Sequence, residues 1–324
     1  MEICPYEFNF PFGISANRNF CVFKSIENIY YLVYSKKFDI FSYNLNDMKI
    51  QNKIAINNFE NKGCYYYVHI LGHLFDKVNK RDLILINTIS NMLIYNFNTL
   101  EFLFSYEANG SLGCLLYDKN KLYMYAQIYD NDHYKDIFID LKEKKVKKFP
   151  SIIIAYFSDS YYEDDKDEWY IILGTVKNII SFKYFSENIK IYHEFSDGIE
   201  VSHVYVKIKK EKEITKLFDG SNDGYIRIWN FHTGELLNKI LICKNFRVLS
   251  FDFLDDKYII CGTSKDIIEL FDIEAKKFIK KVGGCFKEPR YIKTINIPKV
   301  AQYLFVYCET YNEINVFKIS KKDY

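Results

Sequence analysis

The sequence lacks a long apolar segment, a cysteine pair and a basic leader. No apolar run approaches the roughly 20 residues that a membrane-spanning helix needs. The start MEICPYEFNF has no basic segment followed by an apolar one, so it does not indicate a signal peptide. The eight cysteines include no C-x-x-C pair, which argues against a zinc knuckle and a small disulfide scaffold. We therefore expect a cytoplasmic or nuclear protein with buried free thiols.

A marked excess of one charge is also missing. Lysine and arginine number 44 against 42 acidic residues, so bulk charge predicts neither a nucleic-acid partner nor a membrane. Only five of the 44 basic residues are arginine, and 39 are lysine. The bias toward lysine, asparagine, isoleucine and tyrosine resembles proteins encoded by AT-rich genomes. Lysine runs are therefore weak evidence of a site, whereas an arginine is informative.

Apolar residues are plentiful and are arranged as strands. Hydrophobic residues make up 49% of the chain, with 29 tyrosines and 28 phenylalanines, which supplies ample material for a core. Tyrosine, phenylalanine, isoleucine and valine occur in short runs, as in LILIN, YIIL and YLFVY, and this pattern is typical of strands that are buried on both faces.

One unit recurs along the whole chain. The stretch WNFHTGEL at Trp229 has six degenerate copies, and the seven copies are anchored at Tyr43, Tyr95, Ile139, Phe182, Trp229, Phe271 and Phe317. Successive anchors lie 42 to 52 residues apart, close to the period of about 40–45 residues of four-stranded propeller blades. We predict an all-β, seven-bladed β-propeller of antiparallel blades in a single domain, residues 1–324. The expected blades are 19–58, 65–107, 112–149, 152–195, 199–242, 247–282 and 290–324.

The last blade is predicted to be completed by the N-terminus. The chain ends seven residues after Phe317, where the other copies only begin their fourth strand. Residues 3–10 precede the first expected strand, at about 19–26, and belong to no other blade. They are expected to supply the missing fourth strand, where Pro5 is tolerable because that strand is an outer edge.

The copy around Trp229 resembles the WD40-repeat family. The stretch LFDGSNDGYIRIWN matches the signature of that family at Gly220, Asp223, Gly224 and Trp229. In the family, a turn Asp, a strand Ser or Thr, the Trp and a preceding His form a hydrogen-bonded tetrad. Here Asp219 occupies the strand position, and Ser196 to Gly198 replace the usual Gly-His. The resemblance implies a platform that displays peptide-binding surfaces and holds proteins together in a larger complex.

No motif predicts catalysis, a cofactor or a bound metal. His69 and His73 are spaced four apart, but in a strand that spacing is about 13 Å, so joint metal ligation is not expected. The acidic stretch 159–169 is interpreted as a solvated loop. The lysine-rich runs 142–148, 207–213 and 276–281 are assigned to connections or outer strands, where they solubilise the protein or bind RNA or acidic lipids.

Three of the five arginines occupy one repeat position. Arg18, Arg247 and Arg290 lie 25, 24 and 27 residues before their anchors, at the entry to the innermost strand of blades 1, 6 and 7. We predict that they rim one arc of the central channel, together with Lys244 and Lys287. Because a guanidinium offers a planar fork for carboxylate or phosphate, this arc is a hypothetical site for an acidic or phosphorylated segment of a partner. The alternative is that each arginine pairs with a local acid, such as Glu288 beside Arg290.

Two classes of function remain open from the sequence. One is a non-catalytic scaffold or adaptor whose partners are other proteins, without a cofactor. The other is a propeller enzyme whose site at the channel mouth is assembled from scattered loop residues. An enzyme needs a deep pocket with acids or histidines of perturbed pKa, which a platform does not need.

Overall fold

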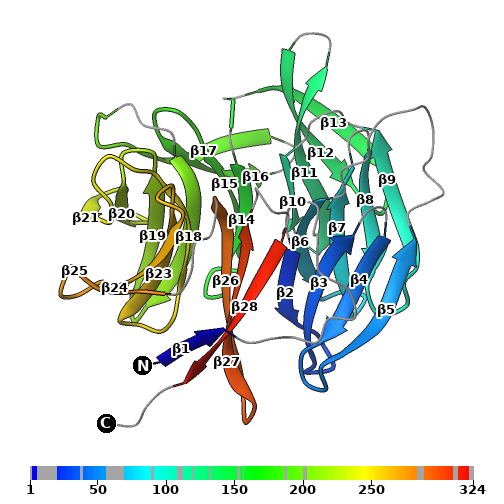
Figure 1. The fold of residues 1–324 in the computed structure, drawn as a ribbon. Helices are drawn as coiled ribbons and strands as arrows, with labels where there is room; N and C mark the ends of the chain where they lie inside the picture. Colours follow the sequence, from blue (N-terminus) through cyan, green and yellow to red (C-terminus); the bar gives the residue numbers. More distant parts are fainter. Residues whose placement is uncertain are drawn as a thin grey trace. The chain divides into compact units, whose positions relative to one another are not determined.

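The chain forms seven separate antiparallel sheets of four strands each (Figure 1). The structure is a computed structural model. It describes residues 2–5, 20–36, 39–55, 69–88, 91–107, 112–118, 120–130, 133–151, 154–155, 157–185, 188–199, 203–282, 288–308 and 313–320. The fold is an all-β, seven-bladed β-propeller, as the repeat predicts. No helix in these ranges is long and apolar enough to cross a membrane.

The first compact unit in chain order holds the first three blades and most of the fourth, residues 16–173 and 181–192. Blade 1 consists of β2 (Phe20–Lys24), β3 (Tyr30–Lys36), β4 (Asp39–Asn44) and β5 (Lys49–Ala55). Blade 2 consists of β6 (His69–Asp76), β7 (Arg81–Asn87), β8 (Asn91–Asn96) and β9 (Phe102–Glu107). Blade 3 consists of β10 (Leu112–Asp118), β11 (Lys121–Asp130), β12 (His133–Asp140) and β13 (Lys145–Pro150). Blade 4 consists of β14 (Phe157–Glu163), β15 (Glu168–Gly174), β16 (Ile179–Phe185) and β17 (Asn188–Phe195).

The second compact unit holds the last three blades together with residues 1–15, 174–180 and 193–202. Blade 5 consists of β18 (His203–Glu211), β19 (Ile214–Ser221), β20 (Tyr225–Asn230) and β21 (Leu236–Leu241). Blade 6 consists of β22 (Val248–Phe253), β23 (Tyr258–Thr263), β24 (Ile267–Asp272) and β25 (Lys277–Lys281). Blade 7 consists of β26 (Pro289–Ile297), β27 (Ala301–Cys308), β28 (Glu313–Ser320) and β1 (Glu2–Pro5).

The N-terminal strand completes the last blade, as predicted. Strand β1 pairs antiparallel with β28, and its four residues face Phe317 to Ser320. Pro5 lies in this edge strand opposite Phe317, where its missing N–H removes no bond from the interior of the sheet. The rest of the predicted strand, residues 6–10, lies outside the described residues.

Deletion of residues 1–12 is expected to lower the melting temperature by several degrees. The deletion removes β1 and leaves one side of β28 without backbone partners, on a strand whose Phe317 and Ile319 are buried. Thermal unfolding followed by circular dichroism at matched protein concentration measures the change. A truncated protein with the melting temperature of the full chain would contradict closure by β1.

Apolar residues on both faces of the strands hold neighbouring blades together. Between blades 1 and 2, Phe23 and Tyr31 pack with Ile84 and Tyr95. Between blades 5 and 6, Phe218 and its neighbours pack on Phe251 and Ile259. Because each inner strand is covered on both sides, continuous apolar runs replace the alternation of a half-solvated sheet.

Two assignments made from charge runs are wrong in part. Of the acidic stretch 159–169, only residues 164–167 form a turn, and Glu163 in β14 is buried. Residues 207–211 of a lysine-rich run lie in the inner strand β18, where Lys207 Nζ is 3.3 Å from Asp252 Oδ1 of blade 6. An acid on the adjacent blade can thus hold a lysine inside the fold, which a linear charge pattern does not reveal.

Candidate functional site

The described hydrogen bonds of the signature residues of blade 5 fall into two groups. Trp229 is buried in β20, and its Nε1–H donates to Asp219 Oδ2 of β19 at 3.0 Å. Its ring also lies edge-on to Phe195 of β17, with centroids 6.0 Å apart. Asp223, in the turn between β19 and β20, accepts from the Ser221 hydroxyl at 2.6 Å. Among the described contacts, the tryptophan bonds Asp219 and the turn acid bonds Ser221 and Arg227, whereas the family resemblance implies a single tetrad.

Gly224 fixes the turn that positions Asp223. Its φ is +83°, and an added Cβ would lie 1.9 Å from the carbonyl oxygen of Cys243. The backbone carbonyl of Gly224 in turn accepts from the N–H groups of Ile242 and Cys243. Only glycine satisfies both the left-handed conformation and this close approach. Gly220 lies buried one residue after Asp219 in β19.

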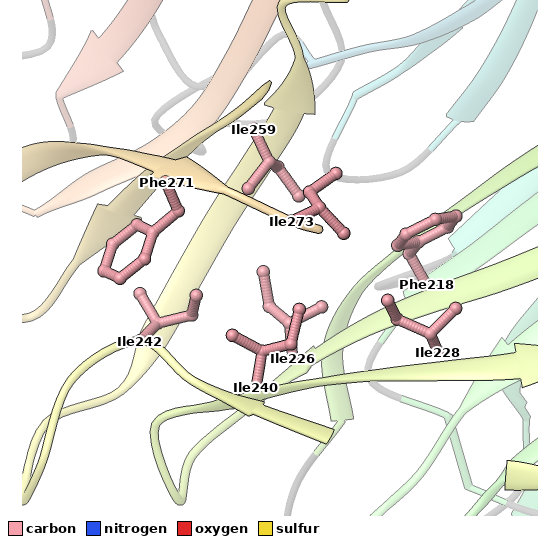
Figure 2. Close-up of a pocket in the computed structure, with 8 residues that line it drawn as sticks. All are labelled: Phe218, Ile226, Ile228, Ile240, Ile242, Ile259, Phe271 and Ile273. Carbon is pink, nitrogen blue, oxygen red and sulfur yellow. The ribbon is translucent and has the colours of Figure 1, made fainter. Parts of the chain in front are cut away.

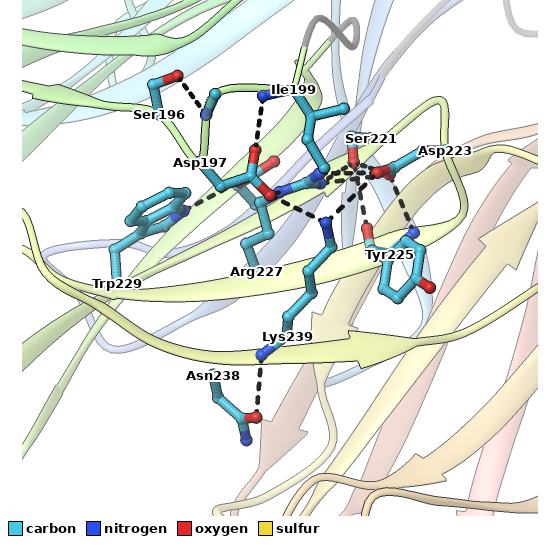
Figure 3. Close-up of polar contacts among 12 residues, drawn as sticks. Ser196, Asp197, Ile199, Ser221, Asp223, Tyr225, Arg227, Trp229, Asn238 and Lys239 are labelled. Carbon is cyan, nitrogen blue, oxygen red and sulfur yellow. Dashed lines mark hydrogen bonds and ion pairs between the residues drawn. The ribbon is translucent and has the colours of Figure 1, made fainter.

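A buried arginine organises the turns of blade 5 (Figure 3). Arg227 of β20 has no exposed side-chain surface. Its Nε donates to Asp197 Oδ2 at 2.8 Å and its Nη2 to Asp223 Oδ2 at 2.7 Å. Its Nη1 donates to the Ser221 hydroxyl at 2.6 Å, and Lys239 Nζ reaches Asp197 Oδ2 at 2.9 Å. This Arg227 centre ties the turn after β17 to the turn between β19 and β20.

Charge pairing outweighs desolvation in this centre. Burial alone would raise the pKa of Asp197, but hydrogen bonds and charges from Lys239 and Arg227 lower that pKa to about 2. Burial likewise opposes the charged forms of Asp223 and Arg227. The contacts with Arg227 and Ser221 nevertheless lower the pKa of Asp223, and the two acids raise the pKa of Arg227. The centre is therefore ionised at neutral pH.

The Asp197→Asn variant is expected to be less stable than wild type at neutral pH and as stable as wild type in acid. Since the pKa of Asp197 falls from 3.8 to about 2 on folding, the ionised side chain stabilises the native state above pH 3.8, and this contribution is lost as the pH falls through about 2. At pH 6, wild type is expected to exceed the variant by roughly 1–2 kcal/mol in free energy of unfolding. Urea titrations of both proteins from pH 6 to pH 2 measure the gap. A gap that is constant over this range would contradict the assignment.

Blade 6 reverses two of the charges of this centre and keeps the third. Two residues before the anchor, Glu269 of β24 occupies the position of Arg227, and Lys281 of β25 faces it across the sheet as Lys239 faces Arg227. Lys265 lies at the turn position of Asp223, with its Nζ 3.9 Å from Glu269 Oε1. Glu269 is 5% exposed, and its Oε2 accepts no hydrogen bond from the described residues. Burial raises its pKa, although Lys265 and Lys281 partly oppose this effect.

Cationic and aromatic side chains lie in two connections near Glu269, between β21 and β22 and between β23 and β24. Lys244, Phe246 and Arg247 are exposed in the connection between β21 and β22. Lys265 Nζ lies 5.4 Å from the centre of the Phe246 ring. We call these four residues the cationic rim. The backbone of Arg247 exchanges hydrogen bonds with Ser264, so the connection is fixed against the turn between β23 and β24.

The predicted arginine arc is described only in part. Arg18 and Lys287 lie outside the described residues. Arg290 is in β26, with Nη2 3.5 Å from Glu288 Oε1, the local pairing that the sequence left open. The N–H of Glu288 donates to Asp266 in the turn between β23 and β24, the turn that also holds Arg247. The backbone of Arg247 and that of Glu288, two residues before Arg290, are thus both bonded to one turn of blade 6.

The histidine considered as a metal ligand takes part in packing. His73 Nε2 lies 2.8 Å from Asp82 Oδ1, and its ring stacks on Phe23 of blade 1 at 3.8 Å. The backbone N–H of Ile26 also donates to Asp82, which joins blades 1 and 2. Within the described ranges, no three His, Cys, Asp or Glu side chains are grouped so that they could hold a metal ion.

Comparison with known proteins supports the fold but identifies no family. No protein-family model and no curated protein sequence matches the chain. A similar solved structure is the crystal structure of Chaetomium thermophilum Raptor, with 12% sequence identity and a TM-score of 0.67. The match covers 96% of this chain and 29% of the Raptor chain, so the present chain spans less than a third of that protein. At this identity the similarity shows a shared fold alone.

Proposed function

We propose that this propeller is a non-catalytic interaction scaffold that binds an acidic or phosphorylated segment of a partner protein. The cationic rim carries the proposal. Lys244 and Arg247 are exposed and make no ion pair with any described residue, and Phe246 next to them is 41% exposed. Cations without acidic partners beside an exposed ring favour an anionic ligand that also has flat or apolar surface.

The ion pairs of Lys265 and of the Arg227 centre favour an anion over a cation as the ligand. Lys265 is 30% exposed, and its only described ion pair, with Glu269, is long at 3.9 Å. It can therefore turn toward an incoming carboxylate or phosphate at small cost. In contrast, the acids of the Arg227 centre are already paired with Arg227 and Lys239. They do not compete for the cations of the rim.

We prefer the scaffold role to the enzymatic alternative because the described cavities are apolar and the described buried acids of blade 5 are already paired. Two small spaces between blades, one between blades 5 and 6 and one between blades 1 and 2, are lined mainly by apolar side chains, and neither lining includes an acid or a histidine. The buried groups of shifted pKa in blade 5 are saturated ion pairs. A propeller that presents unpaired cations on its turns is better suited to hold a partner than to transform a substrate.

Reversal of charge on the rim is expected to abolish partner binding while the fold is retained. The variant carries Lys244→Glu and Arg247→Glu, and a second variant changes Arg18, Arg247 and Arg290 to Glu. Quantitative affinity purification is expected to show at least a tenfold drop in recovered partners, about 1.4 kcal/mol, with a nearly unchanged melting temperature for the first variant.

A matched control separates the rim from net charge. Lys142→Glu with Lys144→Glu makes the same charge change in an exposed turn of blade 3 and is expected to recover partners as wild type does. Phosphatase treatment of the lysate distinguishes phosphorylated from acidic segments. Recovery of partners by the Lys244→Glu, Arg247→Glu variant at the wild-type level would reject the proposal.

A further inference from the structure

Glu269 of blade 6 occupies a repeat position that is apolar in the first four blades. Two residues before their anchors, these blades carry Phe41, Leu93, Ile137 and Ile180. Glu269 is 5% exposed, and its side chain projects from the same face of β24 as that of Phe271, which packs among isoleucines between blades 5 and 6 (Figure 2). The fold therefore does not require a carboxylate at this position.

The carboxylate of Glu269 is incompletely paired. Its Oε2 is buried and accepts no hydrogen bond from the residues that the structure describes. Its Oε1 lies 3.9 Å from Lys265 Nζ, which is beyond hydrogen-bond distance. Arg227, at the equivalent position of blade 5, hydrogen-bonds two acids and a serine. Because native structures rarely bury an acceptor without a partner, Glu269 is a candidate for a functional role.

Lys265 joins the cationic rim to Glu269. Its Nζ lies 5.4 Å from the centre of the Phe246 ring and 3.9 Å from Glu269 Oε1. An anion that docks on Lys244 and Arg247, next to this ring, can attract Lys265 only by drawing it away from Glu269. The buried carboxylate and the incoming anion therefore compete for one ammonium group.

Two lysines and two thiols face Glu269 from the elements around it. Lys265 lies in the turn before β24, and Lys281 faces Glu269 across the sheet from β25. Cys261 faces it from β23, and Cys243 lies in the connection from blade 5. Burial raises the pKa of both thiols, that of Cys243 to about 11, so neither thiol titrates near neutral pH.

Loss of Lys265 from Glu269 would favour protonation of the carboxylate. Burial already raises the pKa of Glu269 above its ordinary 4.5, and the charges of Lys265 and Lys281 oppose this rise. When Lys265 turns to a bound anion, its share of that opposition is lost and a like charge comes nearer, so the pKa of Glu269 rises further. Residues 243–290 include no histidine that would titrate in the same range.

We propose that Glu269 is a built-in competitor for Lys265, and that an anionic segment on the cationic rim takes Lys265 from Glu269 while Glu269 takes up a proton from solvent. The inference rests on the function proposed above and adds its regulation. Proton uptake by Glu269 and anion binding by the rim strengthen each other, since coupling between two sites is reciprocal. The rim therefore binds its partner more tightly as the pH falls.

The test uses the full chain and a rhodamine-labelled peptide with two sulfotyrosines, whose sulfate groups keep their charge from pH 5 to pH 8. Fluorescence anisotropy is expected to show that wild type binds the peptide about fivefold more tightly at pH 5 than at pH 8. Glu269→Gln cannot ionise, so it is expected to bind about fivefold more tightly than wild type at pH 8, and equally at pH 5 and pH 8. Glu274→Gln makes the same change in an exposed turn of blade 6 and is expected to keep the wild-type pH dependence.

Proton uptake is measured directly by calorimetric titration of the peptide in buffers of different ionisation enthalpy. At pH 6, wild type is expected to take up a fraction of a proton for each peptide bound, and Glu269→Gln none. Circular dichroism at each pH checks that the compared proteins are folded.

The outcomes separate this inference from the function on which it rests. Binding that does not depend on pH, or that depends on pH equally in wild type and Glu269→Gln, overturns the role of Glu269 and leaves the rim in place. The Lys244→Glu, Arg247→Glu variant is expected to lose binding at every pH, which tests the rim by itself. If wild type does not bind the peptide at any pH, the rim and the competitor are both rejected.

Discussion

The Arg227→Met variant is expected to lose about 3–5 kcal/mol in free energy of unfolding. Arg227 is fully buried and donates hydrogen bonds to Asp197, Ser221 and Asp223. Methionine fills the space of the side-chain stem but leaves two largely buried carboxylates, for which Lys239 is the one cationic partner that remains among the described residues. Removal of one partner from a buried ion pair costs far more than the pair contributes in net terms, because the remaining charge stays desolvated.

Two companion variants distinguish charge pairing from packing. Arg227→Lys keeps a positive charge but cannot form the fork to both acids, so its cost is expected to lie between wild type and Arg227→Met. Addition of Asp197→Asn to Arg227→Met removes one orphaned charge and is expected to restore part of the loss, a coupling of about 1–3 kcal/mol. Urea denaturation at pH 7 measures the five proteins: wild type, Arg227→Met, Arg227→Lys, Asp197→Asn and the double variant. Strict additivity of the two substitutions would show that Arg227 acts through packing alone.

The fold could be predicted because each repeat is recognisable from the residues of one strand. All seven predicted anchors, from Tyr43 in β4 to Phe317 in β28, lie in the third strand of their blades. Apolar runs and anchor spacing are local properties, and they can be recognised in the blades that lack the signature seen around Trp229. The position five residues after the anchor shows how far the residue types diverge among the blades while the backbone is retained. Gly234 occupies it in blade 5, whereas Met48 and Leu100 adopt the same left-handed backbone in blades 1 and 2.

The Arg227 centre could not be predicted from the sequence. Arg227 stands in a strand among apolar residues, and its partner Asp197 is 30 residues earlier, in the turn after the preceding blade. Nothing local identifies that acid as its partner, since the pairing depends on which face of β20 meets that turn. The one usable signal was an arginine inside a buried strand, which requires a buried acid. For Arg18 and Lys287 of the predicted arc, the position remains a prediction.

Replacement of Trp229 by alanine is expected to cost about 3–5 kcal/mol. The indole is 1% exposed and packs on Phe195, and its Nε1–H is one of the donors to the fully buried Asp219. The substitution therefore creates a cavity and also takes a donor from a desolvated carboxylate, two losses that add in the same direction. Guanidinium denaturation followed by circular dichroism measures the change, since tryptophan fluorescence would then report on Trp169 alone.

Trp229→Phe separates these two losses. Phenylalanine retains most of the apolar contact with Phe195 but donates no hydrogen bond, so its remaining cost reports on Asp219. If that cost comes from the lost donor to Asp219, Trp229→Phe with Asp219→Asn is expected to recover about 1 kcal/mol, because the loss of one donor costs a buried amide less than a buried charge. A cost of Trp229→Ala below about 1 kcal/mol would show that Trp229 is not a core anchor of blade 5. The resemblance to the WD40 signature would then describe a sequence pattern without a structural role.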